Sequence, residues 1–291
     1  MPKVAVMTDT VACIPTDLAR ELAIKVVPAA NIMFDGKTYV ENETITAAEA
    51  YELIKKDPDK FVTSAITPAR LLEDYRQVAA AADEILFITL AGALSAVNKT
   101  ARTAAELFKQ EAPDKTIRVL DSQAVASTQG LVVLAAARAA AAGKSLDEVA
   151  DTATKVRQKT GGLMLLDSLR YIYRTGRMSK TAARLVSLLN IRPINRLTPE
   201  GTIEMADRTR RRMEGLEKLL ALIAREAGTR DLHFMLVHAS APEMAEGFAD
   251  RLRQEFNVLS LVVSDYSPVM GYGSGPGAIF AGFHPELGLS G

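Results

Sequence analysis

The chain has 291 residues, a length at which two domains are expected, and its 35 basic residues balance 35 acidic residues. This neutrality excludes a chain-wide charge that would attract nucleic acid or an anionic membrane. Cys13 is the only cysteine, which excludes an intrachain disulfide framework and a cysteine-based zinc site. The early acid Asp9 argues against a signal peptide, and no apolar run approaches the roughly 20 residues of a membrane helix. We therefore expect a cytoplasmic protein without membrane insertion.

The first half of the chain alternates between short apolar segments and helical patterns. Strands are predicted at residues 3–7, 24–34, 84–90 and 116–120. Helices are predicted at residues 15–22, 46–55, 67 onward, 95–110, 127–142 and 145–159, with hydroxyl caps at Thr16, Thr46, Thr67, Ser95 and Ser145. This alternation implies a parallel sheet that helices cover on both faces. We assign residues 1–160 to this N-terminal domain.

The pattern changes after Gly161 and Gly162. Strands are predicted at residues 162–166, 191–197, 202–206, 232–238, 259–264 and 278–283, and helices at 179–189, 210–226 and 241–256. Pro199, Glu200 and Gly201 read as the turn of a hairpin. Hairpins mixed with helices predict a mixed-sheet α/β domain over residues 161–291.

Residues 271–277, with the sequence Gly-Tyr-Gly-Ser-Gly-Pro-Gly, lie between the last two predicted strands. Alternate glycines remove side chains from one side of the backbone, which allows a sharp turn or the close approach of a ligand. The plain interpretation is a wide hairpin loop. The functional interpretation places Gly273 and Ser274 against a ligand, and one version of it is a backbone nest that holds a phosphate ester.

Small polar residues mark the predicted junctions between strands and helices. Asp9, Ser95 and Ser122 each follow a predicted strand, and Thr63 comes shortly before a predicted helix. Each also has a plain role as a cap or loop residue. Open α/β sheets bind ligands at this edge, and a helix N-terminus favours a carboxylate. We therefore predict that Asp9, Thr63, Ser95 and Ser122 line a ligand site.

No general base accompanies these residues. His233, His238 and His284 lack companions at metal-ligand spacing, and His233 and His238 should face opposite sides of one strand. Ser95 is not in a Gly-x-Ser-x-Gly sequence. The sequence favours a binding protein without a metal or cofactor, and a serine-dependent acyl hydrolase that uses Ser95 stays as the alternative.

Arginines gather in the second half. Arg177 lies beside Gly176 at a predicted turn, where it forms either a surface ion pair or part of the site. A second group comprises Arg192, Arg196, Arg208, Arg210, Arg211 and Arg212. Such a group is usually a solvated face, but it also suits the docking of an acidic partner.

Taken in chain order, these motifs resemble the DegV family, whose fatty-acid-binding members serve bacterial fatty acid kinase. The resemblance covers nearly the whole chain. It rests on Thr8-Asp9-Thr10, Ile14-Pro15, Thr63-Ser64, Leu94-Ser95, Asp121-Ser122, Ser127, Gly130, the segments 169–179 and 189–194, and Gly275-Pro276-Gly277-Ala278.

The resemblance implies an α/β/α N-terminal domain, a two-layer C-terminal domain and a long-chain fatty acid held between them. It implies that Thr63 and Ser95 bind the ligand carboxylate, and that the catalytic subunit of a fatty acid kinase is the partner. Arg196, Arg208, Arg210 and Arg212 are our candidates for docking that subunit. Two departures stand out: residues 91–97 lack most of the family's hydroxyls, and Gly273 replaces a histidine.

Overall fold

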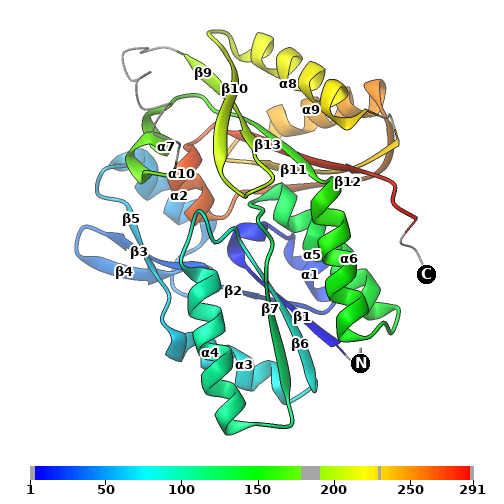
Figure 1. Ribbon diagram of the computed structural model, residues 1–291. Helices are drawn as coiled ribbons and strands as arrows, with labels where there is room; N and C mark the ends of the chain where they lie inside the picture. Colours follow the sequence, from blue (N-terminus) through cyan, green and yellow to red (C-terminus); the bar gives the residue numbers. More distant parts are fainter. Residues whose placement is uncertain (1–3, 178–190, 229–230, 289–291) are drawn as a thin grey trace.

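The computed structural model describes residues 4–177, 191–228 and 231–288, which form three β-sheets with helices between and around them (Figure 1). The predicted fold class is confirmed, because the first half holds a parallel sheet and the second half a mixed sheet. Within these ranges, no helix is both long enough and apolar enough to cross a bilayer.

The first sheet has four parallel strands in the order β2-β1-β6-β7. These strands are β1 (Val4–Asp9), β2 (Ile24–Val27), β6 (Glu84–Thr89) and β7 (Thr116–Asp121). The helices α3 (Pro68–Ala79) and α4 (Val97–Glu111) pack on this sheet, and the short helix α1 (Thr16–Glu21) packs on β2. A 3-10 turn, η1 (Thr10–Ala12), follows β1 directly.

The second sheet has six strands in the order β10-β9-β8-β13-β11-β12. Its only parallel pair among the described strands is β11 with β12. The strands are β8 (Gly161–Leu165), β9 (Arg192–Leu197), β10 (Ile203–Thr209), β11 (Asp231–His238), β12 (Asn257–Asp265) and β13 (Ile279–Pro285). The helices α8 (Arg212–Ala227) and α9 (Pro242–Glu255) pack on it.

The helix α5 (Ser127–Ala141) joins the two sheets, because it packs against β1 of the first sheet and against β11 and β13 of the second. It is apolar and buried nearly all round, as expected for a helix between two layers. Gly130 permits this packing, since a Cβ there would overlap Met235 and the carbonyl of Ala12. The second sheet begins at Gly161, directly after α6 (Leu146–Lys159), but residues of both halves share one hydrophobic core.

Arg157 of α6 ties the hairpin of β9 and β10 to the first half of the chain. Its buried guanidinium donates to the carbonyls of Gln123 at 2.7 Å, Thr198 at 3.0 Å and Pro199 at 3.0 Å. The antiparallel pairing of β9 and β10 confirms the predicted hairpin, and its turn contains Gly201 with a φ of 80°.

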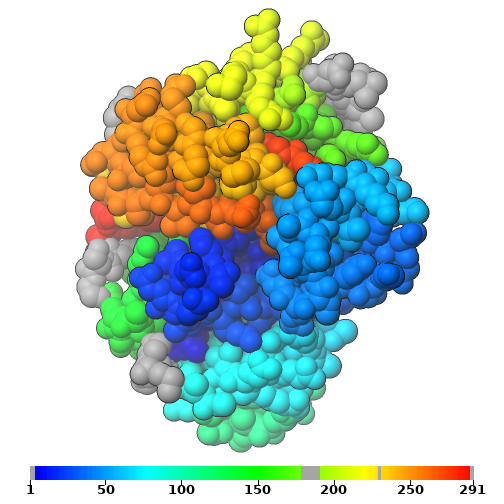
Figure 2. Space-filling view, turned by 180° about the vertical axis from the view of Figure 1, so that it is seen from behind, coloured from blue at the N-terminus to red at the C-terminus, as the bar shows by residue number. Residues whose placement is uncertain are grey.

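A third sheet projects beside both halves, with the antiparallel order β4-β3-β5. It consists of β3 (Ala30–Phe34), β4 (Lys37–Val40) and β5 (Val62–Ala65), and the helix α2 (Ala47–Lys56) belongs to the same lobe. Figure 2 shows the blue surface of this lobe beside the orange C-terminal segments, where α2 contacts α10 (Pro268–Ser274). The prediction of one strand over residues 24–34 was wrong: Pro28, which cannot donate to a sheet, separates two strands of different sheets.

Local helix signals were mostly predicted well. Thr46 and Ser145 each form a capping box, and Thr67 caps α3. Thr16 is not a cap, because α1 begins at Thr16 itself with Pro15 before it. The helix expected at 179–189 lies outside the described residues.

The glycine-rich segment is not a hairpin loop or a nest. Residues Pro268–Ser274 form α10, which starts with Ser267 as its cap and proline at its first position. The strands β12 and β13 are not neighbours, since β11 lies between them. Left-handed backbone begins only at Gly275, with a φ of 77°, where a Cβ would overlap the ring of Tyr171.

Candidate functional site

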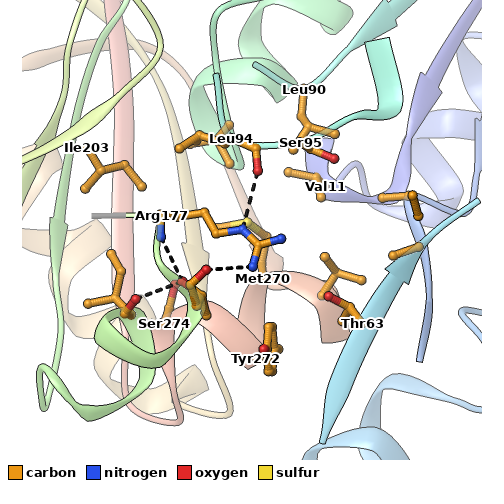
Figure 3. A pocket seen from close by; sticks show the side chains of 18 of the residues that line it. Val11, Thr63, Leu90, Leu94, Ser95, Arg177, Ile203, Met270, Tyr272 and Ser274 are labelled. Carbon is orange, nitrogen blue, oxygen red and sulfur yellow. Dashed lines mark hydrogen bonds between the residues drawn. The ribbon is translucent and has the colours of Figure 1, made fainter. Parts of the chain in front are cut away.

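A cavity of about 210 Å³ lies between the carboxyl ends of β1 and β6, the strand β5 and the helix α10 (Figure 3). This is the edge at which open α/β sheets bind ligands. The helix α7 (Arg170–Thr175) and the strand β8 close the other side. Most of the wall is apolar, and it includes Val11, Ala29, Ala30, Leu90, Leu94, Val125, Met164, Ile172, Ile203, Val269 and Met270.

Three predicted hydroxyl residues meet in this wall. Thr63 comes from β5, Ser95 from the loop before α4, and Ser274 from the end of α10, with Gly273 beside it. The Oγ of Ser95 accepts from the backbone N–H of Val97 at 3.3 Å, which leaves its own hydrogen for another acceptor. The hydroxyl of Thr63 makes no hydrogen bond to any other described residue. The hydroxyls of Ser95 and Thr63 are therefore available to an oxygen-bearing ligand.

Arg177 is the one charged residue among the described residues that line the cavity. Its Nε donates to the carbonyl of Leu94 at 3.4 Å and its Nη1 to the carbonyl of Thr175 at 2.8 Å. Figure 3 shows its guanidinium reaching between Leu94, Met270 and Thr63. Within the described ranges Arg177 forms no ion pair, so the plain interpretation as a surface salt bridge does not describe it.

Asp9 does not line the cavity but lies buried behind it. Its carboxylate accepts from the backbone N–H groups of Val11 at 3.1 Å and Leu90 at 2.8 Å, and from Nε2 of Gln129 at 3.2 Å. Burial raises the pKa of Asp9 to about 6, although these hydrogen bonds act to lower it. Because Val11 and Leu90 both belong to the wall, Asp9 shapes the site from behind.

Ser122 is also placed away from the cavity. It is buried, its Oγ donates to the carbonyl of Ala124 at 3.3 Å, and it accepts from the N–H of Ala124 at 3.1 Å. Its hydroxyl closes the turn between β7 and α5, which carries the lining residue Val125. Asp9 and Ser122 were predicted to line the cavity, and this was wrong. Both side chains lie behind the wall and hold residues that line it.

Glu41 is a second buried carboxylate near the site, and no sequence motif predicted its position. Its Oε1 accepts from the backbone N–H of Val269 at 2.9 Å, and its other oxygen accepts from the hydroxyl of Thr10. Burial raises the pKa of Glu41 to about 7. The side chain thus links η1 to the start of α10, a contact across 228 positions that no local motif could predict.

The described lining of the cavity offers no group of residues for acyl transfer. None of the described residues that line it is a histidine, lysine, aspartate or glutamate, so Ser95 has no base within reach there. Among the described residues, no group of histidine, cysteine and acidic side chains could hold a metal ion. The arrangement suits binding of an amphipathic anion.

The arginines predicted to dock a partner divide into two sets. Arg196 pairs with Glu226 and with Glu204, and Arg212 pairs with Asp167, so these two guanidinium groups are engaged within the chain. Arg208, Arg210 and Arg211 are exposed and form no ion pair with a described residue, whereas Arg212 is exposed but paired. Arg208 and Arg210 therefore keep the predicted free charge, whereas Arg196 and Arg212 do not.

Comparison with known proteins identifies relatives along nearly the whole chain. The family model described as DegV family COG1307 matches residues 3–286. The DegV domain-containing protein TTE1491 of Caldanaerobacter subterraneus is 30% identical over 284 residues, covering 96% of this chain and 97% of that protein. The protein SCO2569 of Streptomyces coelicolor is 32% identical over 278 residues, covering 95% and 96%.

Solved structures give the same result for the fold. The DegV family protein Cg2579 of Corynebacterium glutamicum superposes with a TM-score of 0.83 at 26% identity, covering 99% of this chain and 98% of that chain. A Thermus thermophilus DegV family protein, described by its fatty acid binding, superposes with a TM-score of 0.87 at 25% identity, covering 98% and 100%.

Proposed function

Because this chain belongs to the DegV family, we propose that it binds a long-chain fatty acid in the cavity between β5, the end of β6 and α10. The observation that carries the proposal is a mostly apolar cavity whose described lining residues include one cation, Arg177, and the two available hydroxyls of Thr63 and Ser95. The Thermus thermophilus relative, described as a fatty acid binder, supports the same ligand class.

The ligand carboxylate would be held by Ser95, Thr63 and Arg177. Hydrogen bonds to a charged group contribute about 1.5–3 kcal/mol each, and a guanidinium suits a planar carboxylate. Arg177 and Gly273 line the same cavity, and the resemblance to the family implies a histidine at the position of Gly273. The guanidinium of Arg177 would supply a positive donor to the ligand in its place.

The acyl chain would occupy the apolar part of the cavity. A sixteen-carbon chain releases about 12 kcal/mol gross, at ~0.8 kcal/mol per buried methylene, before ordering costs. The cavity volume of about 210 Å³ is below the roughly 300 Å³ at which ordinary ligand sites begin, so lining side chains must move on binding. Met164 and Met270 suit this role, because methionine side chains adapt to irregular spaces.

The protein would act as a carrier subunit with the fatty acid as its only ligand. An acyl phosphate forms when the carboxylate takes the terminal phosphoryl group of ATP and ADP leaves, and the catalytic subunit of a fatty acid kinase would supply that ATP. The exposed group of Arg208, Arg210 and Arg211 is our candidate docking surface for that subunit. The alternative of a phosphate-ester ligand rested on a backbone nest at residues 271–277. Residues 271–274 are helical and form no nest, so this alternative is not favoured.

Mass spectrometry of lipid extracted from the denatured protein tests the proposal. We expect close to one fatty acid per chain in wild-type protein and in the Arg177→Lys variant, and little in Arg177→Glu, whose carboxylate repels the ligand. Arg177 makes no ion pair with a described residue, so neither change should disturb the fold. Absence of stoichiometric lipid from independent wild-type preparations would contradict the proposal, and ester turnover abolished by Ser95→Ala would favour the hydrolase.

A further inference from the structure

Away from this cavity, three side chains form a continuous hydrogen-bonded line across the second sheet. The Oγ of Ser260 lies 2.8 Å from Nδ1 of His233, and Nε2 of His233 lies 2.8 Å from Oε2 of Glu286. A hydroxyl, an imidazole and a carboxylate in this order form the arrangement by which hydrolases activate a serine. The separation in sequence hides it, since the three residues belong to β12, to β11 and to the segment after β13.

Strand register creates this line. His233 pairs with Ser260 on one side and with His284 on the other, and Glu286 follows His284 by two positions and so returns to the same face. The pairing of β11 with β12 shifts between Leu232 and His233, which skips Leu259 and brings Ser260 opposite His233. Bulges of this kind re-aim side chains and are frequent beside active sites.

The charges around His233 favour its role as a base. The hydrogen bond from His233 lowers the pKa of Glu286, so its carboxylate is ionised and accepts the Nε2 hydrogen. This tautomer turns the free lone pair of Nδ1 toward Ser260. His284 stacks on His233 with ring centres 4.8 Å apart, and burial lowers the pKa of His284, so the stacked ring carries no opposing charge at neutral pH.

A separate cavity of about 280 Å³ opens beside this line, on the face of the sheet that α5 and α6 cover. Its walls include Leu131, Leu134, Val156 and Val262, and Arg138 adds a cation. The volume is at the lower limit for small-molecule sites, which favours a short acyl group.

We propose that Ser260, His233 and Glu286 form a second site that hydrolyses small carboxylic esters, independently of the fatty-acid cavity. Ser260 Oγ would attack the ester carbonyl carbon while its proton passes to Nδ1 of His233. The tetrahedral intermediate, with Arg138 as the nearby cation for its oxyanion, expels the alcohol, which takes the proton from His233. Water then attacks the acyl group on Ser260, gives a proton to His233 and releases the carboxylic acid as that proton returns to Ser260.

Covalent labelling of the intact wild-type protein tests the nucleophile without any variant. A fluorophosphonate probe should modify Ser260, located by peptide mass spectrometry, and heat-denatured protein should not react. Absence of an adduct on Ser260, or an adduct only on another serine, would overturn the proposal.

Hydrolysis of p-nitrophenyl acetate by purified variants tests the roles of the three residues. We expect Ser260→Ala to lower kcat by a factor on the order of 10³, whereas Ser264→Ala on the same strand retains activity. Glu286→Gln, a change to a positioning residue, should lower kcat with little effect on KM and displace the pH profile. Equal turnover by wild type and Ser260→Ala would refute the proposal, and loss of turnover in Ser95→Ala would assign the chemistry to the other cavity.

Discussion

The backbone N–H of Leu90 donates to Oδ2 of Asp9 across 2.8 Å, and this bond joins the carboxyl ends of the neighbouring strands β1 and β6. The other oxygen of Asp9 accepts from Val11 and Gln129. One buried carboxylate therefore fixes two segments of the cavity wall relative to each other, and the shape of the site depends on a residue that does not line it.

Replacing Asp9 with alanine should destabilise the protein and loosen the cavity. Two backbone N–H groups and one side-chain amide would lose their acceptor, and each unsatisfied buried donor costs about 1–3 kcal/mol. Urea unfolding should show a lower midpoint, and bound lipid should dissociate faster. Asp17→Ala is the control, because the Asp17 side chain is 95% exposed and its loss should leave both quantities unchanged. Equal midpoints for Asp9→Ala and wild type would contradict this role.

Glu41 should make stability fall as pH rises. Its pKa is raised from 4.5 to about 7 by burial, so between these values the folded protein keeps a proton that the unfolded chain has released. The resulting stabilisation is complete below pH 4.5 and is lost as pH rises through 7. Glu41→Gln stays neutral at every pH. We therefore expect its stability relative to wild type to increase between pH 5 and pH 8 by up to roughly 3 kcal/mol, measured by urea unfolding.

Glu43 provides the matched control for this pH series. A hydrogen bond from Arg70 lowers the pKa of Glu43, so its contribution has the opposite sign: it is present above pH 4.5 and is lost as pH falls. Glu43→Gln should thus lose stability relative to wild type toward neutral pH. A flat difference between Glu41→Gln and wild type across the series would show that Glu41 is ionised in the folded protein.

Local chemistry allowed the prediction of helices but not of how distant segments meet. Thr46 and Ser145 were recognised from capping boxes, which depend on residues three positions apart. A loop was the plain prediction for residues 271–277, because glycine is common in loops, but residues 271–274 belong to the helix α10. Here Gly271 is required inside a helix, since any Cβ would overlap the ring of Tyr51, a neighbour 220 positions away that no sequence window contains.

The same limit applies to the candidate site. The position of Ser95 after a parallel strand predicted the correct edge of the sheet, because chain order fixes which strand ends meet there. The hydrogen bond from the N–H of Leu90 to the carboxylate of Asp9 and the burial of Glu41 depend on packing between segments that are far apart in the sequence. The line through His233 depends on a one-residue shift in strand pairing, which neither composition nor spacing reveals.

Two glycine-to-alanine changes should have opposite effects on stability. Gly275 has a φ of 77° and faces the ring of Tyr171, so Gly275→Ala adds backbone strain and a clash at the end of α10. Gly247 lies exposed within α9 with open space around it, so Gly247→Ala should stabilise that helix by about 0.5–1 kcal/mol. Differential scanning calorimetry should give a lower Tm for the first variant and a higher one for the second. A Gly275→Ala protein as stable as wild type would refute the packing at Tyr171.

Removing the Ser95 hydroxyl should weaken fatty acid binding without affecting folding. Loss of a hydrogen bond to a charged carboxylate costs about 1.5–3 kcal/mol, which corresponds to roughly 10–150-fold in Kd. Ser95→Ala and Thr63→Val should each show this loss in titrations of delipidated protein with a fluorescent fatty acid. Thr103→Ala, a hydroxyl on the exposed face of α4, serves as the control. Unchanged affinity in both cavity variants would place the carboxylate elsewhere.

Under the proposed function, recruitment of a kinase catalytic subunit should depend on the unpaired exposed arginines and not on the paired ones. Arg208, Arg210 and Arg211 can meet an acidic surface directly, whereas Arg212 is already paired with Asp167, which also pairs with Arg192. Replacing the three exposed arginines with glutamate should abolish acyl-phosphate formation by the kinase catalytic subunit, while retained lipid and Tm stay the same.

A charge-matched variant separates docking from net charge. Replacing Lys109 on α4 and Lys155 and Lys159 on α6 with glutamate changes the net charge of the protein by the same amount as the triple arginine variant. Acyl-phosphate formation should continue in this lysine variant. Acyl-phosphate formation with the wild-type protein should also fall as the salt concentration rises. Exposed charges steer the encounter of the two proteins, and salt screens these charges. If the variant at Arg208, Arg210 and Arg211 is phosphorylated as fast as wild type, the docking surface lies on another face.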